Sequence, residues 1–154
     1  MYQYAVIGDE YLFEEFIQDL FNFQYNTESF QLYKSKGGKQ HGIDVFSIEK
    51  RVVIQCKKKD ILHSDKILRT ELKHDLDISL ELIEHLPFDF DLFIMASTTK
   101  KYGEIQDYAA KLSQQKPFDV KFLSWKDIEK MIHKNIEIIE KYYPQKVEGS
   151  EMDR

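Results

Sequence analysis

The run Val52-Val53-Ile54-Gln55-Cys56-Lys57 is rich in β-branched residues and predicts a strand. A second run of the same kind, Ile43-Asp44-Val45-Phe46-Ser47-Ile48, precedes it, and only Glu49-Lys50-Arg51 separates the two. Two strand-like runs with so short a connection are typical of a β-hairpin. We therefore expect a hairpin at the centre of the fold and predict the other elements outward from it.

Upstream of the hairpin, the sequence predicts a helix and a short strand. Apolar residues spaced as on one face of a helix form a stripe: Phe13, Phe16, Ile17, Leu20 and Phe21. Asp9, which follows Gly8, is the expected N-cap of this helix. The segment 30–33 alternates like a strand, and the glycines in 36–39 indicate a loop.

Downstream of the hairpin, helices and strands alternate. The expected elements are a long helix capped at Ser64 or Asp65 and ending before Pro87, a strand over 91–96 ended by 97–99, a helix over 103–115, a strand over 120–123, and a helix from Ser124 to about Tyr142. This order predicts an α/β protein, with a mixed β-sheet of about five strands and helices on both faces.

The length of the chain fits one domain. Most domains hold roughly 100–150 residues, and the chain has 154, of which 42% are hydrophobic. We assign residues 1–143 to this domain. Residues 144–154 show no apolar pattern, so we expect a flexible C-terminal tail or linker there.

Composition narrows the possible locations and partners. The single cysteine, Cys56, excludes an internal disulfide and a thiolate metal cluster, and it fits a cytoplasmic protein. We find no signal peptide and no apolar run of the roughly 20 residues that a membrane span needs. The net charge is −5, but residues 30–60 hold eight cations and three acids. Such a basic segment can contact phosphates whatever the mean charge, although it can equally be a solvated surface.

Four side chains are predicted to converge near the end of the second hairpin strand. Alternate residues of a strand share a face, so Gln55 and Lys57 project together, and a hairpin places Asp44 beside them. On the first helix, Glu14 borders the apolar stripe and is able to reach over the sheet. Glu15 is turned by a further 100° toward solvent.

This combination suits phosphodiester hydrolysis. The reaction needs a divalent ion to polarise the phosphoryl oxygen and to lower the pKa of the attacking water, and Mg²⁺ prefers oxygen ligands. Asp44 is the expected main ligand, supported by Glu14, the amide oxygen of Gln55 and the backbone carbonyl of Cys56. Lys57 would orient the water or stabilise the charge that develops on the phosphate.

The pattern resembles the PD-(D/E)XK nuclease superfamily. A helix Glu in 12–16, G-x-D within 37–45, and a strand ending Q-x-K within 53–58 are similar to the Mrr-like branch of restriction-endonuclease-like proteins, which includes anti-phage effector nucleases. The resemblance implies a restriction-endonuclease-like sheet and Glu14, Asp44, Gln55 and Lys57 as the catalytic set. Because Gln55 replaces the acid of the commonest motif, the number of metal ions stays open.

The resemblance also implies the substrate and cofactor. We expect an endonuclease that cuts double-stranded DNA in restriction or anti-phage defence and uses Mg²⁺, for which Mn²⁺ can substitute. Residues predicted to contact DNA flank the site: Lys34, Lys36, Lys39, Gln40, His41, Lys58 and Lys59. His41 is either a phosphate contact, a proton shuttle or a polar loop residue. A domain with one active site cuts both strands only as a pair, so we expect a homodimer or a higher assembly, organised in part by a region outside this chain.

Two alternatives use the same sequence features. A catalytically silent nuclease fold would bind DNA through the basic segment without cutting it. A protein-interaction module would use the acidic helices as its working surface. Metal-dependent nicking separates the first alternative from an enzyme, and salt-sensitive DNA binding would count against the second.

Overall fold

The computed structural model describes residues 3–34 and 41–147. Its elements, in chain order, are α1 (Glu10–Gln24), β1 (Gln31–Leu32), β2 (Val45–Ser47), β3 (Val52–Lys57), α2 (Asp65–Leu82), the 3₁₀ helix η2 (Ile83–His85), β4 (Leu92–Ser97), α3 (Gly103–Gln115), β5 (Asp119–Leu123), α4 (Trp125–His133) and α5 (Ile136–Tyr142). Two predicted N-caps are present. An Asp9 carboxylate oxygen accepts a hydrogen bond from the Leu12 N–H at 2.8 Å, and the Ser64 hydroxyl accepts one from the Ile67 N–H at 3.3 Å.

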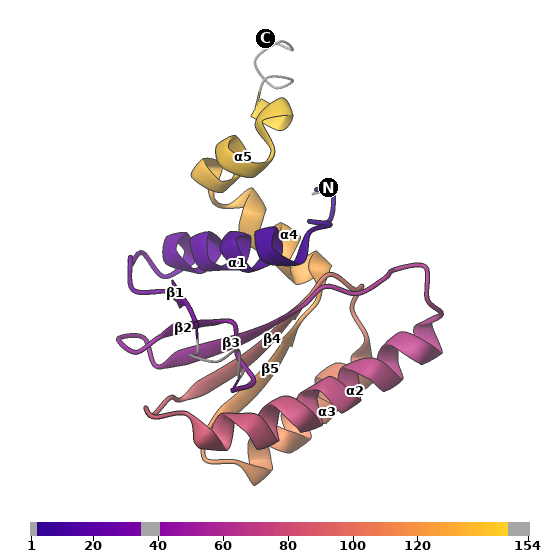
Figure 1. Cartoon of the computed structure of the whole chain (residues 1–154). Helices are drawn as coiled ribbons and strands as arrows, with labels where there is room; N and C mark the ends of the chain where they lie inside the picture. The colour runs from indigo at the N-terminus through magenta and orange to yellow at the C-terminus, as the bar shows by residue number, and fades with distance from the viewer. Residues whose placement is uncertain (1–2, 35–40, 148–154) are drawn as a thin grey trace.

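The strands form one five-stranded mixed sheet in the order β1-β2-β3-β4-β5. The pairs β1–β2 and β2–β3 are antiparallel, and β3–β4 and β4–β5 are parallel. In Figure 1, α2 and α3 cover one face of this sheet, and α1 and α4 lie on the other. The predicted α/β class, with a mixed sheet and helices on both faces, is therefore confirmed.

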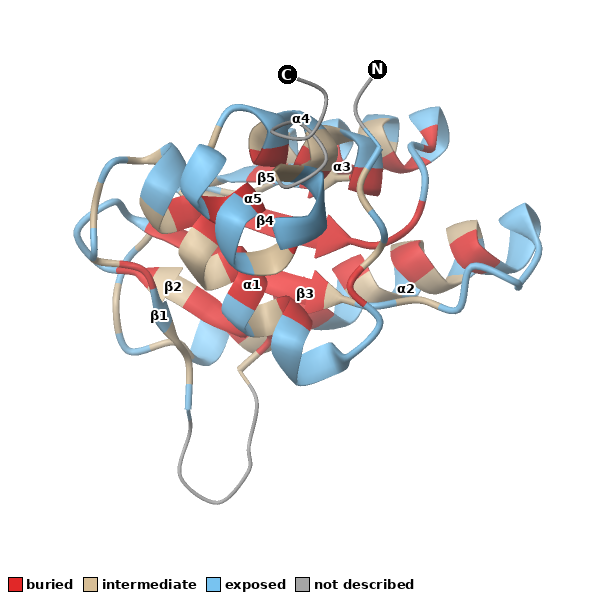
Figure 2. Cartoon of the chain, turned by 90° about the horizontal axis from the view of Figure 1, so that it is seen from above, coloured by how far each residue is buried: buried red, intermediate tan, exposed pale blue. Residues whose placement is uncertain are grey.

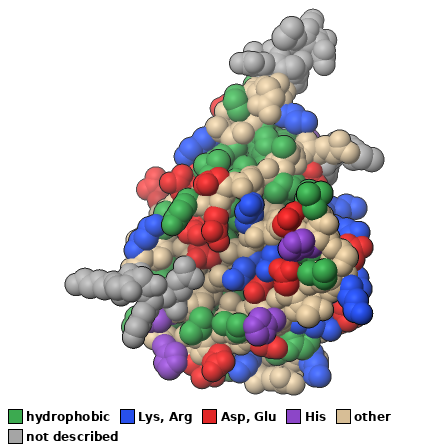
Figure 3. Space-filling view, turned by 45° about the vertical axis from the view of Figure 1, so that its right-hand side comes forward, with side chains coloured by type: hydrophobic (Ala, Val, Ile, Leu, Met, Phe, Trp, Pro, Cys, Tyr) green, Lys and Arg blue, Asp and Glu red, His purple; other side chains and the backbone are tan. Residues whose placement is uncertain are grey.

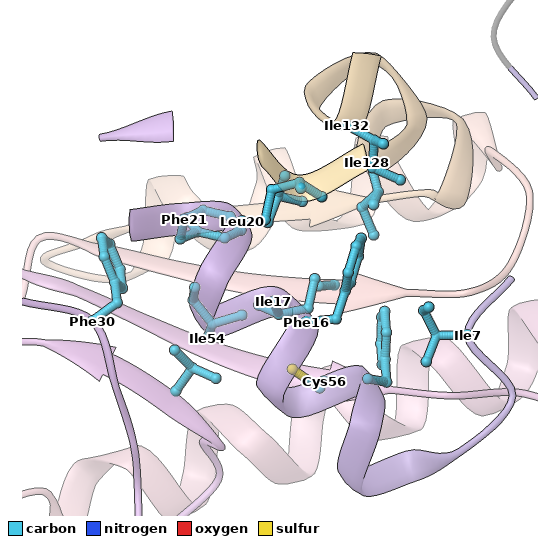
Figure 4. Packing of buried hydrophobic residues seen from close by; sticks show 14 of the residues in the cluster. Ile7, Phe16, Ile17, Leu20, Phe21, Phe30, Ile54, Cys56, Ile128 and Ile132 are labelled. Atoms are coloured by element: carbon cyan, nitrogen blue, oxygen red, sulfur yellow. The ribbon is translucent and has the colours of Figure 1, made fainter. Parts of the chain in front are cut away.

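Each face of the sheet has its own hydrophobic core, because successive residues of a strand point to opposite faces. The core beneath α1 contains Ile54 and Cys56 of β3, together with the apolar stripe of α1. Figure 4 shows both strand residues lying under α1. The core beneath α2 and α3 contains Val53 of the same strand. Figure 2 shows the result: the strands are buried along most of their length, and the helices expose their outer surfaces.

The last predicted helix is in fact two helices, and this part of the prediction is wrong. The chain leaves α4 at Lys134 and enters α5 at Ile136. The Asn135 amide donates a hydrogen bond to the Met131 carbonyl at 2.7 Å, and its backbone N–H donates to Ile132, three residues back. Side chains such as Asn compete with the backbone in this way, which explains the break within an otherwise continuous apolar pattern.

The C-terminal end of the described chain packs against the domain. Val147, beyond Pro144, packs against the core beneath α1, so the chain contacts the domain at least to this residue. Residues 148–154, the rest of the predicted tail, lie outside the described residues.

In the described ranges, the helices are all too short or too polar to cross a membrane.

Candidate active site at the end of strand β3

Asp44 is anchored between two strands immediately before β2. Its backbone N–H donates to the Ile54 carbonyl at 2.8 Å, and its own carbonyl accepts from the Tyr33 N–H at 2.8 Å. The side chain turns back toward β3, where one carboxylate oxygen accepts the Cys56 N–H at 2.8 Å. The residue is only 7% exposed. This carboxylate therefore lies at the edge between β2 and β3, close to the end of the parallel part of the sheet.

The glycine two residues earlier allows this approach. Gly42 has φ +81°, a left-handed conformation that favours glycine. A Cβ at this position would lie 2.7 Å from the Ser79 carbonyl oxygen on α2, closer than such atoms approach. Gly42, the glycine of the G-x-D pattern, therefore lets the backbone pass close to α2 two residues before Asp44.

Gln55 and Lys57 share the face of the sheet that α2 covers. Gln55 lies next to Met95, a residue of the core on that face, and the Lys57 amine lies 3.9 Å from an oxygen of Asp75 on α2. Gln55 is 5% exposed, and its amide oxygen has no hydrogen-bond partner in the described structure. A buried acceptor without a donor is costly, so a donor or a cation beside this oxygen would stabilise the structure.

Glu14 approaches from the opposite face, on which α1 packs. Its side chain is half-buried, whereas Glu15 is exposed, as predicted. Burial, followed by repulsion from Asp44 and Glu10 and opposed by Lys34, raises the pKa of Glu14 to about 7. Glu14 therefore packs on the face opposite to that of Gln55 and Lys57, which the predicted convergence of the four side chains did not anticipate. Asp44, between β2 and β3, is near enough to both sides for its charge to act on Glu14 and for the charge of Lys57 to act on Asp44.

The pKa of Asp44 is raised, because burial outweighs the influences that lower it. Burial raises its pKa, while the hydrogen bond from the Cys56 N–H and the charge of Lys57 lower it. The Cys56 thiol is buried, and burial together with the charges of Asp44 and Glu14 raises its pKa well above the usual range. This thiol stays protonated, so the backbone carbonyl is the only group of Cys56 suited to a hard metal ion.

The donor set fits a hard divalent cation. It comprises two carboxylates, of Glu14 and Asp44, together with the Gln55 amide oxygen and the Cys56 carbonyl, all oxygen donors of the kind that Mg²⁺ takes. A cation beside Glu14 would stabilise this carboxylate, whose pKa is raised, and the Gln55 oxygen on the other face of the sheet lacks a hydrogen-bond donor in the described structure. Within residues 3–34 and 41–147, no three Asp, Glu, His or Cys side chains form a metal-binding group. The predicted ligand set has only two acidic side chains, Glu14 and Asp44, so it is not a group of this kind.

The residues predicted to contact DNA fall into four groups. Lys34 and Lys58 are exposed. His41 is half-buried, and its Nδ1 lies 2.6 Å from the Tyr33 hydroxyl. Lys59 forms ion pairs with carboxylates of α2. Lys36, Lys39 and Gln40 lie outside the described residues. Figure 3 shows acidic and basic side chains next to each other on the face that it displays.

Sequence analysis missed three acidic residues near the site. Glu10 raises the pKa values of both Glu14 and Asp44. Its spacing of four residues from Glu14 places it on the same helix face, so the signal was present. Asp75 and Glu71 on α2 contact the lysines of β3 and the segment after it. Their spacing of four residues is visible in the sequence, but the contact with β3 depends on where α2 packs.

Comparisons with protein-family models, curated proteins and solved structures found no match. Support for a function therefore comes from the residues and geometry of this site. The five-stranded mixed sheet, with helices on its two faces, defines the class as α/β.

Proposed function

We propose that the chain is a metal-dependent endonuclease that hydrolyses phosphodiester bonds of double-stranded DNA, of the Q-x-K type of the PD-(D/E)XK superfamily. The observation that carries the proposal is the position of Asp44. Its carboxylate accepts a hydrogen bond from the Cys56 N–H of β3. The charge of Asp44 raises the pKa of Glu14, and the charge of Lys57 lowers the pKa of Asp44. The mixed sheet with helices on both faces supports a restriction-endonuclease-like fold.

Glu14, Asp44, the Gln55 amide oxygen and the Cys56 carbonyl would hold Mg²⁺ or Mn²⁺. When bound, the ion would supply a Lewis acid for the phosphoryl oxygen and a water of lowered pKa. Asp44 is fixed by its hydrogen bond, so it needs little rearrangement to bind. The Lys57 ammonium, 30% exposed, is placed to contact the phosphate or the attacking water as negative charge develops.

The DNA would lie over the exposed lysines beside the site. Lys34 lies close enough to Glu14 and Asp44 for its charge to affect both carboxylates. Lys58 is exposed directly after the Q-x-K sequence. Phosphate contacts of this kind give affinity without sequence specificity. One site cuts one strand, so double-strand cleavage requires a second copy of the domain.

Plasmid nicking tests the proposal. Wild type, Asp44→Ala, Lys57→Ala and the matched control Glu15→Gln are incubated with supercoiled plasmid and Mg²⁺, Mn²⁺ or chelator, and calorimetry measures Mn²⁺ binding. Wild type and Glu15→Gln should nick only with metal. Asp44→Ala should lose both metal binding and cleavage. Lys57→Ala should bind the metal but lose about 10²–10³ in rate. The assignment of roles fails if Asp44→Ala binds Mn²⁺ normally or if Lys57→Ala cuts at full speed.

One observation favours a second candidate, a nuclease fold that binds DNA without cutting it. In the described part of the chain, the proposed metal ligands include only two carboxylates, because Gln55 stands where an acid is usual. A silent module would shift DNA in a gel without nicking it in either metal. The absence of nicking therefore distinguishes the silent module, whereas Gln55→Glu, which adds a charge, should tighten metal binding whatever its effect on turnover.

A further inference from the structure

Asp75 of α2 lies between two lysines: Lys57, the last residue of β3, and Lys59, two residues beyond it. One carboxylate oxygen lies 2.7 Å from the Lys59 amine, and the other lies 3.9 Å from the Lys57 amine. The side chains of Asp75 and Lys59 are only 15% and 14% exposed. Coulomb attraction is stronger and less screened at such partly buried positions than on an open surface.

The backbone after β3 keeps Lys59 in place. The Lys59 N–H donates to the Thr98 hydroxyl at 2.9 Å, and the Thr98 N–H donates to the Lys57 carbonyl at 3.3 Å. Thr98 is 2% exposed at the end of β4. The segment thus continues beside β4, and Lys59, two residues beyond Lys57, faces the same helix. The Lys59 amine also donates a hydrogen bond to a Glu71 carboxylate oxygen at 3.0 Å.

The unequal distances give the two lysines different roles. Lys59 takes the close contact with Asp75, so it neutralises most of the carboxylate's pull. Lys57 is drawn toward α2 but stays at the outer limit of an ion pair. A tight pair would hold the Lys57 ammonium away from a phosphate, whereas no pair would leave its long side chain without orientation. The observed arrangement avoids both.

We propose that Asp75 is a positioning residue for Lys57, and that Lys59 acts as a counter-ion that prevents Asp75 from sequestering the Lys57 ammonium. The inference rests on the proposed nuclease function, since it assigns Lys57 the contact with the reacting phosphate. The inference also changes the role expected of Lys59: this residue supports Lys57 through Asp75 and does not contact DNA.

The proposal predicts that removing the Asp75 carboxylate partly restores the nicking rate that is lost when Lys59 is replaced. Lys59→Met should lower the rate constant for nicking about 10²-fold, because the unneutralised Asp75 closes on Lys57 and displaces it. Asp75→Asn should lower it about tenfold, because Lys57 loses its orientation. In the double variant, Asp75→Asn removes the group that sequesters Lys57. Its rate should therefore equal that of Asp75→Asn alone, about tenfold faster than Lys59→Met.

The experiment measures single-turnover nicking of plasmid in Mg²⁺ by wild type, both single variants and the double variant. Asp75→Glu, which keeps the carboxylate, should restore most of the rate. Asp77→Asn on the same helix, whose carboxylate accepts from the Tyr108 hydroxyl, is the matched control and should nick like wild type. Each loss should fall on the rate at saturating DNA, with DNA affinity unchanged. Thermal unfolding checks folding, and Lys59→Gln replaces Lys59→Met if the latter does not fold.

The outcomes separate the inference from the proposed function. If the single losses multiply in the double variant, or if Lys59→Met nicks at the wild-type rate, the inference is overturned while the nuclease stands. If the losses appear as weaker DNA binding, Lys59 is a DNA contact and the inference is again overturned. If wild type does not nick in Mg²⁺ or Mn²⁺, the proposed function fails and the inference fails with it.

Discussion

Two helices each bring a pair of acids, spaced four residues apart, toward the same end of β3, and the two pairs differ in how their charge is compensated. On α2, Glu71 and Asp75 both contact the amine of Lys59. On α1, Glu10 and Glu14 face Asp44, and the described residues include no ion pair of either glutamate. Lys34 acts on them only through its more distant charge.

The consequence is visible in the pKa shifts. A hydrogen bond from Lys59 is the largest influence on Glu71 and lowers its pKa, as expected of a carboxylate with a partner. Burial and the charge of Asp44 raise the pKa of Glu14 to about 7. Folding alone would not favour three acids gathered at one strand end. Perturbed groups of this kind concentrate at functional sites, and Glu14 and Asp44 are therefore the carboxylates that we expect to bind the metal.

The largest expected effect separates function from stability at Asp44. Asp44→Asn keeps an acceptor for the Cys56 N–H but removes the charge. We expect a loss of about 10²–10³ in nicking rate and a loss of Mn²⁺ affinity. Because repulsion of Glu14 is also removed, the metal-free variant should be more stable than wild type at pH 8. Nicking, calorimetry and urea unfolding measure the three quantities. A variant that is less stable at pH 8 would show that the carboxylate is structural.

The next effect compares exposed lysines with the paired one. Lys34 and Lys58 are exposed, whereas Lys59 is bound to α2. Reversing Lys34 and Lys58 to Glu should weaken DNA binding at low salt and reduce the log–log salt slope by about one unit for each lost phosphate contact. Lys59→Met should leave the slope unchanged. Fluorescence anisotropy over a range of salt concentrations provides the measurement. A salt slope that changes only in Lys59→Met would mean that Lys59, rather than Lys34 and Lys58, contacts the DNA.

A third effect concerns the pH dependence of stability on the α1 side. The folded pKa of Glu14 is raised above 4.5, so the folded state binds more protons than the unfolded state between pH 4.5 and about 7. The free energy of unfolding should therefore fall as pH rises through this window. After allowance for partial exposure, the fall is about 1–2 kcal/mol. Glu14→Gln should reduce this fall, leaving the part that comes from Asp44, whose pKa is also raised, and Mg²⁺ should offset the fall in wild type.

Urea unfolding at pH 5 and pH 8, with and without Mg²⁺, tests this expectation. Glu15→Gln is the matched control, because Glu15 is exposed on the same helix. Equal pH dependence in Glu14→Gln and wild type would show that the burial of Glu14 carries no energetic strain. The assignment of Glu14 to the metal site would then lose its electrostatic support.

Much of the fold follows from local patterns. The hairpin was predictable because β-branched runs flank a short connection, and the pairing of Val45 with Ile54 sets Asp44 near Gln55. The partial burial of Glu14 and the exposure of Glu15 followed from their angles on α1, but the face of the sheet on which Glu14 packs did not. The break at Asn135 was not predicted, because the apolar spacing continues across it and only the side-chain bond to Met131 reveals the competition.

The α2 side of the site could be predicted only in part. The alternation that places Gln55 and Lys57 on one face also applies to Lys59, so the different surroundings of Lys58 and Lys59 were open to prediction. The partners of Lys59 were not. Glu71 and Asp75 reach it because α2 packs across the sheet, and that packing depends on contacts far apart in the sequence. Sequence spacing alone gives no such distance.

The smallest expected effect has the opposite sign to that of Glu14 and completes the comparison. The pKa of Glu71 is lowered, so its contribution to stability is present above the ordinary pKa of 4.5 and is lost as pH falls through the folded value. Glu71→Gln should therefore destabilise the protein at pH 7, by about 0.2–1 kcal/mol, because the side chain is 36% exposed and its ion pair is screened. The effect should shrink in 1 M salt, where the Debye length is about 3 Å. Urea unfolding of Glu71→Gln and Glu14→Gln at the same pH values should give changes of opposite sign at high pH. If both variants stabilise the protein, the α2 acids are as poorly compensated as those on α1, and the distinction between the two sides of the site disappears.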